Sequence, residues 1–529
     1  MLIPGRHHVL TGFQFDYLRA LLDAGSATDV DGQQVLFADH VTAVWAVTSA
    51  NHGSTRRNPV AGHRREAAIE LFHADLGVEG MTFLIDDLPT TPRFADHILK
   101  EIEVQSNGLT RLTPANCAVA TSTPAVIDMF ETLGFQVLPL ELARRDPEVL
   151  QAQRAWDVLL RIVAAGSQWR SDPDYCALAH RSTRRVFARY GLGDQIVGVH
   201  ADPVVGDEGD LTDTRDYQTY VRSFEEGATR KYALARDLVQ PGRIVDVGCA
   251  TGAILELMAE DDRLRESDLY GIEVARPLYE ICQHRKSLGE FPNANTFFYH
   301  RNILRTDLFA ERSVHTTTTF SLTHEIESYA GHDALLEFLH RIFRHTAPGG
   351  VFINYDVAGP DEPEREVLLC LSDADGGVDD GRVLDHDDAE GVRRYVDGLS
   401  TWGRFERFAR DFRAAEGERF DWEPAEVEDR RAARLRLADA MEFLSKKDYT
   451  DNWLSEMHER FCFFTYADWR RALEDVGFRI VPGSRALRND WIVEHRLRPV
   501  ARLLDAGDPS VTLAWPATNV LIAGTRDRV

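Results

Sequence analysis

Long apolar runs are missing from this sequence: no uninterrupted stretch approaches the ~18 apolar residues that a membrane-spanning helix needs. We therefore expect no transmembrane helix. Cysteine is scarce as well, and its six residues never form a C-x-x-C pair. Together with the lack of a recognisable signal peptide, this predicts reduced thiols and a cytoplasmic location. No metal site is predicted.

Positive charge is in deficit. The chain has 60 Lys and Arg against 85 Asp and Glu, which gives a net charge of -25. Nucleic-acid binding requires a basic surface that displaces counterions, so this balance argues against nucleic acid as a partner. A small anionic ligand in a local basic pocket stays open. We therefore expect small-molecule partners, with neither nucleic acid nor membrane, and a homodimer is an open alternative.

The chain is too long, at 529 residues, for one typical domain. In residues 1–195, short apolar runs such as "AVWAVTSA" alternate with helical patterns such as "PAVIDMFETLGF", which predicts β-α units and a parallel sheet. Residues 196–215 are predicted as a linker. A second α/β pattern fills residues 216–529, and a charged, mostly helical insertion at about 360–447 interrupts it as a lid. The predicted fold class is α/β, with two Rossmann-like doubly wound domains.

The strongest chemical signal is "RIVDVGCATGAILELMAE", residues 243–260. An apolar strand ends in Asp246, a glycine-rich turn follows, and a helix begins. Small side chains in the turn let a ligand approach the backbone and the helix N-terminus closely. A second strand, "LYGIEV", ends in Glu273, whose carboxylate is suited to bind a ribose diol. The predicted cofactor-binding residues of the turn are Gly248, Cys249, Ala250 and Gly252.

The elements that follow narrow the interpretation. "TFFYHRNIL" predicts a third strand ending near Asn302, and "HTTTTFSLTHEIESY" a fourth ending near His324 and Glu325. A helix, the turn "APGG" and the strands "VFINYDV", "GFRIV" and "TNVLIAGTR" then complete a seven-stranded sheet. This order resembles the class I S-adenosylmethionine-dependent methyltransferases over most of residues 216–529. The resemblance implies that the glycine-rich turn holds the methionine part of the cofactor, Glu273 the ribose, and Asn302 the adenine. Ala250 departs from the commoner glycine.

The acceptor side of such a site is less well marked. Methyl transfer is an in-line displacement, so the enzyme contributes positioning and desolvation, and a base only where the acceptor carries a proton. His324 and Glu325 are the catalytic candidates, as base or acceptor anchor. Alternatively, His324 caps a helix and Glu325 lies in its first turn. Upstream, Tyr217, Tyr220 and Arg230 are predicted to close over the cofactor, unless their helix is simply a solvated one.

The N-terminal region carries a second set of motifs: "PGRHHVLTGFQFDYL", "VTSANHGSTRRNPVAGHRRE", "VATSTPAVIDMFETLGFQV" and "HRSTRRVFARYG". Over residues 1–195 they resemble the nucleotidylyltransferase superfamily, most closely the nicotinamide-mononucleotide adenylyltransferases of the archaeal type. The resemblance implies that this domain binds a nucleotide. The residues it assigns to nucleotide binding are Gly5, Arg6, Thr11, Asn58, Arg64, Arg65, Ser182 and Thr183.

The catalytic loop departs from that family. Where its members carry the two histidines of H-x-G-H, this chain has Thr11 and Gln14, with Phe13 in place of the glycine. Glutamine cannot supply the positive charge that phosphoryl transfer uses, and Phe13 would crowd the backbone. His7 and His8 could substitute only in a rearranged loop. The sequence thus predicts a domain that recognises a nucleotide without transferring one.

Together, the two regions suggest an S-adenosylmethionine-dependent methyltransferase of specialised metabolism. The hypothesis is N-methylation of a small metabolite that carries a nucleotide, derived from NAD or a nicotinamide nucleotide. One alternative is a bifunctional nucleotidylyltransferase and methyltransferase. Another is a methyltransferase whose N-terminal domain is purely structural and mediates dimerisation.

Overall fold

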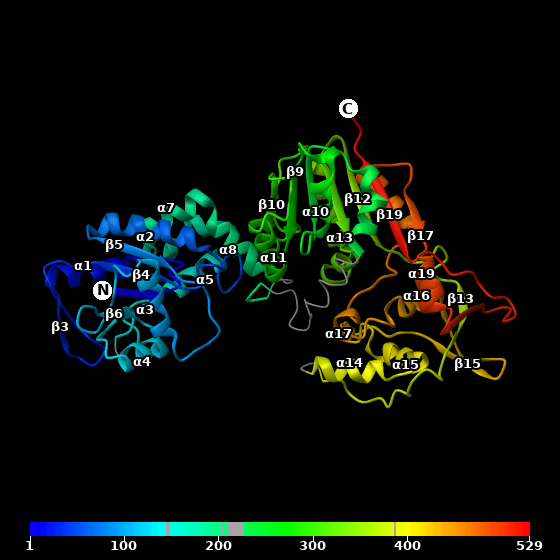
Figure 1. Cartoon of the computed structure of the whole chain (residues 1–529), viewed down its shortest axis with the longest axis horizontal. Coiled ribbons are helices and arrows are strands. Elements are labelled where there is room, and N and C mark those ends of the chain that lie inside the picture. Colours follow the sequence, from blue (N-terminus) through cyan, green and yellow to red (C-terminus); the bar gives the residue numbers. More distant parts are fainter. Residues whose placement is uncertain (144–148, 203–205, 210–226, 386–387, 529) are drawn as a thin grey trace. The chain divides into compact units, whose positions relative to one another are not determined.

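The computed structural model describes residues 1–143, 149–202, 206–209, 227–385 and 388–528. The chain divides into two compact units, Met1–Gly209 and Asp210–Val529. Figure 1 colours the first from blue to teal and the second from green to red. No helix in the described ranges is long and apolar enough to cross a membrane. All six cysteines are free thiols.

The first unit is built on a five-stranded sheet with the order β5-β4-β1-β6-β7. All neighbouring strands are parallel, as the sequence predicted. Its strands are β1 (Leu2–Gly5), β4 (Ala43–Val47), β5 (Gly80–Leu84), β6 (Val119–Thr121) and β7 (Val137–Pro139). The chain adds β4 and β5 on one side of β1 and then β6 and β7 on the other. A ligand crevice is expected where the order reverses, beyond the carboxyl ends of β1 and β6.

Helices cover both faces of this sheet because its side chains alternate between them. Ile3 and Trp45 face a cluster with α1, α2 and α5 to α8, and Leu2 and Val44 face one with α3 and α4. The helices are α1 (Gly12–Ala24), α2 (Gly62–Leu76), α3 (Phe94–Gln105), α4 (Pro124–Thr132), α5 (Ala155–Ala165), α6 (Pro173–Leu178), α7 (Arg181–Tyr190) and α8 (Leu192–Ala201). A hairpin of β2 (Ser26–Thr28) and β3 (Gln34–Leu36) follows α1.

The predicted linker begins within a helix. It was placed at residues 196–215, but α8 continues to Ala201. The apolar residues Ile196 and Val197 pack α8 against the first unit, so this part belongs to the domain and not to a linker. Residues 203–205 and 210–215 of that prediction lie outside the described residues.

The second unit contains a mixed sheet in the order β10-β9-β8-β11-β12-β19-β16, with β17 paired to β19. The seven predicted strands are present, and β17 is an eighth. The strands are β8 (Arg243–Val247), β9 (Asp268–Glu273), β10 (Thr296–His300), β11 (Val314–Phe320), β12 (Thr346–Val357), β16 (Arg479–Ile480), β17 (Arg485–Leu487) and β19 (Asn519–Thr525). Two strands end earlier than predicted, β10 at His300 and β11 at Phe320, so Asn302 and His324 lie in the loops beyond.

Both faces of this sheet are covered as well. Apolar residues of α10 (Ala253–Glu260) and α11 (Arg276–Ser287) form a core with one face, and those of α13 (His332–His345) and α18 (Tyr466–Val476) with the other. The short helix α12 (Thr323–Glu325) follows β11 directly. Strands β8, β9 and β11 are parallel, so their carboxyl ends lie at the same edge of the sheet. The loops that follow these strands meet at that edge.

The insertion differs from the predicted helical lid at about 360–447. It contains a four-stranded antiparallel sheet, β14-β15-β13-β18, whose last strand comes from far along the chain. Its elements are β13 (Glu366–Leu371), α14 (Ala389–Asp397), α15 (Thr401–Asp411), β14 (Glu423–Val427), β15 (Arg430–Arg436), α16 (Leu437–Lys446), α17 (Trp453–Glu456), α19 (Asp490–Ile492) and β18 (Ala501–Asp505). We call residues 359–464 and 488–518 the inserted subdomain, the lower yellow-to-red part of the second unit in Figure 1.

Backbone hydrogen bonds join the chain segments that enter and leave the inserted subdomain. The Gly359 N–H donates to the Phe464 carbonyl at 2.9 Å, and the Thr518 N–H donates to the Leu487 carbonyl at 2.9 Å. The inserted subdomain has its own hydrophobic core, which includes Phe405, Phe408 and Phe443 and packs its sheet against its helices.

Candidate functional site

The glycine-rich turn after β8 has the backbone that its sequence predicts. Gly248 and Gly252 have φ angles of 67° and 81°, a region that favours glycine. A Cβ atom at Gly248 would lie 2.9 Å from the Leu322 side chain, so the turn has no room for one. Ala250 shares this left-handed conformation, with a φ of 48°. Cys249 is fully buried beneath the turn.

Glu273 closes the turn from the end of β9. Its Oε2 accepts the Ala250 N–H at 2.9 Å, and its Oε1 accepts the Val274 and Ala275 N–H groups at 2.9 and 2.8 Å. Burial raises its pKa to about 7, although these donors lower it. A carboxylate has about four lone-pair sites, so Oε2 can also accept a ligand hydroxyl. The turn and this acceptor fit the amino acid and ribose parts of S-adenosylmethionine.

Two further ionisable groups lie beside the turn, the buried Asp246 and the half-buried Lys231, and the sequence singled out only Asp246. Burial raises the pKa of Asp246 to about 7, and the Thr318 hydroxyl donates to it at 2.7 Å. Lys231 donates to the Ser321 hydroxyl at 3.0 Å, and burial lowers its pKa to about 8. The signal for Lys231 was its spacing with the buried Ala228 and Tyr232, which places it on the inner face of a helix.

Of the residues predicted to close over the cofactor, only Arg230 lies in the described part of the chain, and its charge contributes to the lowered pKa of Lys231. Arg230 is exposed, and Tyr217 and Tyr220 lie outside the described residues. Asn302, beyond β10, uses its side-chain oxygen to accept the Leu304 N–H at 2.9 Å. Glu325 is half-buried. Burial is the main cause of the raised pKa of Glu273, and the negative charge of Glu325 raises it further. Glu325 and Glu273 therefore lie within electrostatic reach of each other.

His324 lies between two buried carboxylates. Its Nδ1 lies 2.6 Å from Asp356 Oδ1 at the end of β12, and its Nε2 lies 3.4 Å from Glu459 Oε2 in the inserted subdomain. Burial alone would lower the His324 pKa, but Asp356 and then Glu459 raise it well above its usual value. The ring is thus a charged imidazolium with both nitrogens engaged, which is poorly suited to accept a proton.

Further hydrogen bonds join the same two parts of the unit. The Tyr329 hydroxyl donates to Glu459 at 3.2 Å, and the Arg460 N–H donates to the Ser328 hydroxyl at 2.8 Å. Asp356 also accepts the Thr323 N–H at 2.6 Å. The segment after β11 therefore connects the sheet with the inserted subdomain. Sequence analysis missed Asp356 and Glu459, although an acid ending the strand "VFINYDV" was a visible signal.

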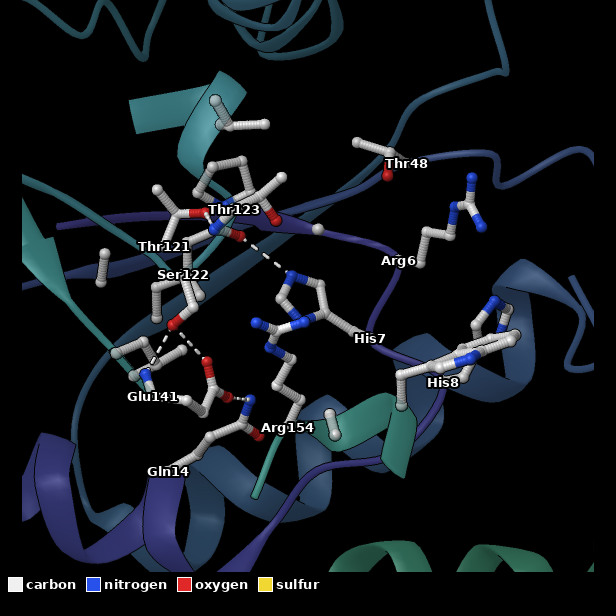
Figure 2. Close-up of a pocket in the computed structure, with 18 of the residues that line it drawn as sticks. Arg6, His7, His8, Gln14, Thr48, Thr121, Ser122, Thr123, Glu141 and Arg154 are labelled. Carbon is white, nitrogen blue, oxygen red and sulfur yellow. Dashed lines mark hydrogen bonds between the residues drawn. The ribbon is translucent and has the colours of Figure 1, made fainter. Parts of the chain in front are cut away.

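In the first unit, a cavity of about 510 Å³ opens at the carboxyl ends of β1 and β6 (Figure 2). This is the predicted crevice, where the strand order reverses. Two of the predicted nucleotide-binding residues, Gly5 and Arg6, line it. The polar lining residues are Arg6, His7, His8, Gln14, Thr48, Thr121, Ser122, Thr123, Glu141 and Arg154.

Thr11 and Gln14 form a capping box at the start of α1. The Thr11 hydroxyl accepts the Gln14 N–H at 3.1 Å, and the Gln14 side-chain oxygen accepts the Thr11 N–H at 3.0 Å. A T-x-x-Q pattern before an apolar run is a signal for such a cap. The two residues compared with the histidines of the H-x-G-H motif thus begin the helix, and Thr11 does not line the cavity.

Other predicted nucleotide-binding residues are engaged inside the domain. Thr183 is buried and bonds with both the N–H and the carbonyl of Leu10, and Ser182 contacts His180. The Arg65 guanidinium donates to the carbonyls of Arg6, Thr48 and Ser49. Arg64 stacks over Tyr190 at 3.6 Å. Asn58 is buried. The structure places none of these side chains among the residues that line the cavity.

Comparison with known proteins gives a match for the second unit. A sequence model described as a methyltransferase domain matches residues 217–482, which is half of the chain. Among solved structures, an S-adenosylmethionine-dependent methyltransferase from Mesorhizobium loti is 14% identical to this chain. The match covers 57% of this chain and 100% of that one, with a TM-score of 0.32. One from Aquifex aeolicus is 11% identical, with coverages of 58% and 98% and a TM-score of 0.27.

No curated protein matches the sequence. The matched residues of the methyltransferase model begin after the first unit, so the identity of the parallel α/β domain in residues 1–209 is not given by that match. The second unit carries the matched segment, the glycine-rich turn and the acid that ends β9. The chain belongs to the methyltransferase domain family, and its second unit is an S-adenosylmethionine-dependent methyltransferase domain.

Proposed function

We propose that this enzyme methylates a nitrogen atom of a small metabolite that carries a nucleotide, and that the first unit binds the nucleotide part. The observation that carries the proposal is the cavity at the strand-order reversal of the first unit, beside Arg6. Arg6 is half-buried, and its guanidinium donates a hydrogen bond to the Arg57 carbonyl at 3.3 Å. A guanidinium held in this way suits the recognition of a phosphate. An NAD- or nicotinamide-nucleotide-derived acceptor fits this arrangement.

The chemistry of the second unit follows from its own residues. S-adenosylmethionine, when bound, supplies a methyl group on a sulfonium for an in-line displacement. The glycine-rich turn and Glu273 bind and orient it, and desolvation around Asp246 strengthens the attraction of a cation. Glu325 is the candidate to accept a proton or anchor the acceptor. His324, already protonated between Asp356 and Glu459, positions the loop instead.

The first unit is proposed to recognise its ligand without transferring a nucleotidyl group. The side-chain oxygen of Gln14 is committed to the helix cap. Burial lowers the pKa of His7 to about 4 and lowers the pKa of His8 well below its usual value. Neutral imidazoles cannot supply the positive charge that transfer from a triphosphate uses. This supports recognition over the bifunctional alternative.

The test is a calorimetric titration of the full chain with nicotinamide mononucleotide, its dinucleotide and ATP. We expect one of the nicotinamide nucleotides to bind without release of pyrophosphate, and Arg6→Ala to weaken that binding at least tenfold. Arg64→Ala is the matched control, because Arg64 stacks on Tyr190 away from the cavity. ATP binding with pyrophosphate release would support the bifunctional alternative. Absence of binding by all three would leave the first unit a structural role.

A further inference from the structure

Glu141 forms part of the floor of the cavity in the first unit. It is 5% exposed and lies just beyond β7, and it lines the cavity with Ser122 and Gln14. The Gln14 amide donates to its Oε1 at 2.7 Å, and the Ser122 hydroxyl donates to its Oε2. Figure 2 shows these side chains converging at one end of the cavity. The cavity therefore has a buried carboxylate where a phosphate would be repelled.

The surroundings of Glu141 hold it as an acceptor. Burial raises the pKa of Glu141, and the hydrogen bonds from Ser122 and Gln14 and the charge of Arg154 oppose that rise; both hydrogen bonds are donated to the Glu141 oxygens. The Gln14 amide cannot turn over, because its oxygen accepts the Thr11 N–H in the capping box. Each carboxylate oxygen accepts one of these bonds and can accept another. A ligand group that reaches this floor must therefore donate an N–H or O–H.

The rest of the cavity has a different character. Arg6 lines it as a half-buried cation. His8 is 6% exposed, and neither of its ring nitrogens has a hydrogen-bond partner among the described residues. A buried polar side chain without a partner is costly, so a ligand that bonds His8 is favoured. Phe94 and Trp156 also line the cavity and add aromatic surface to it.

We propose that Glu141 determines the specificity of this cavity: it binds the hydrogen-bond-donating head group of a small ligand, such as a carboxamide, whose phosphate lies against Arg6 and His8. This rests on the proposed function and narrows its ligand class. It excludes ligands with a carboxylate in place of that head group, because a second anion would face Glu141. The Gln14 side chain makes both contacts: its oxygen completes the helix cap, and its amide nitrogen donates to the Glu141 carboxylate.

Two ligands that differ only at the head group test this: nicotinamide mononucleotide and nicotinic acid mononucleotide. We expect the full chain, titrated without S-adenosylmethionine, to bind the carboxamide at least about tenfold more tightly, since hydrogen bonds to a charged group are worth roughly that factor or more. Glu141→Gln should reduce the preference to less than about threefold, because a glutamine amide can also donate to a carboxylate. Glu103→Gln is the control, on an exposed position of α3.

The wild-type ratio alone can overturn the proposal, whether or not the variants fold. Equal binding, tighter binding of the acid, or no binding of either nucleotide contradicts it, as does an unchanged preference in Glu141→Gln. The methyl-transfer reaction is assayed separately. Discrimination without methylation of any nucleotide leaves this inference standing while the proposed function fails. Methylation of a nucleotide without discrimination between the two head groups supports the proposed function and overturns this inference.

Discussion

Single residues of the cofactor turn show how the backbone limits the sequence. Ala250 adopts a left-handed conformation that costs an L-residue about 1 kcal/mol. Glycine avoids that cost but loses more entropy on folding, by about 0.4–1 kcal/mol. These effects nearly cancel, which explains why an alanine is tolerated between Gly248 and Gly252. Glu273 fixes the same residue through its N–H group.

Replacing Ala250 tests this balance. We expect Ala250→Gly to change the free energy of unfolding by less than about 1 kcal/mol. Ala259→Gly, within helix α10, should lower it by about 1 kcal/mol, because there glycine has only the entropic cost. Urea denaturation of both variants measures the difference. Equal losses in the two variants would show that the left-handed backbone at Ala250 carries no strain.

The buried acids Asp246 and Glu273 predict a pH dependence of cofactor binding. Burial raises both pKa values to about 7, so both groups gain negative charge between pH 6 and 8. Affinity for the cationic cofactor should therefore rise with pH, by roughly fivefold to tenfold over this range. Glu273→Gln should flatten part of this rise. Titration calorimetry with S-adenosylmethionine at several pH values checks it, and a pH-independent affinity in the wild type contradicts it.

At the scale of elements, the capping box connects α1 to the cavity. Thr11→Ala removes the side chain that accepts the Gln14 N–H, and we expect a loss of about 1 kcal/mol in the free energy of unfolding. Gln14→His introduces a histidine at the position compared with the H-x-G-H motif but removes the amide that bonds Glu141. It should therefore destabilise the chain and produce no pyrophosphate from ATP. A gain of transferase activity in Gln14→His would contradict the structural role given to this residue.

His324 contributes a charged contact to the link between the sheet and the inserted subdomain. At pH 7, His324→Gln should lower the free energy of unfolding by about 3 kcal/mol, because it leaves Asp356 and Glu459 buried without their cation. The folded pKa of His324 is raised, so its contribution is complete below its unfolded pKa and declines as pH rises through the folded value. The difference in the free energy of unfolding between the variant and the wild type should become smaller above pH 7. A difference that stays constant from pH 6 to 10 contradicts this.

Elements with a local signal could be predicted from the sequence, and those that depend on distant partners could not. Strand β4 is a continuous apolar run, β8 is apolar at three of its five residues, and glycines mark the turn after β8. In contrast, β15 reads "RRAARLR" and pairs on one side with β13, which in turn pairs with β18, a strand that begins at Ala501, 130 residues after β13 ends at Leu371. Such charged strands have no clear apolar pattern, so the insertion looked helical. His324 was found, but its role depends on Glu459, which only tertiary structure brings near.

At the scale of the whole molecule, we propose that the first unit binds the acceptor's nucleotide part and the second unit carries out methyl transfer. Each has its own hydrophobic core, so each can hold its own ligand site. The account predicts that changes in the cavity of the first unit alter the use of the acceptor and leave cofactor binding unchanged. A purely structural first unit predicts no such separation.

The most direct test of the central claim follows methyl transfer from isotopically labelled S-adenosylmethionine to a panel of nicotinamide and adenine nucleotides, in wild type and Arg6→Ala. The account predicts label on a nitrogen of a nucleotide-bearing acceptor. Its KM should rise at least tenfold in Arg6→Ala, while the KM for the cofactor stays within twofold. Label only on acceptors without a nucleotide, or an acceptor KM unchanged by Arg6→Ala, would contradict the account.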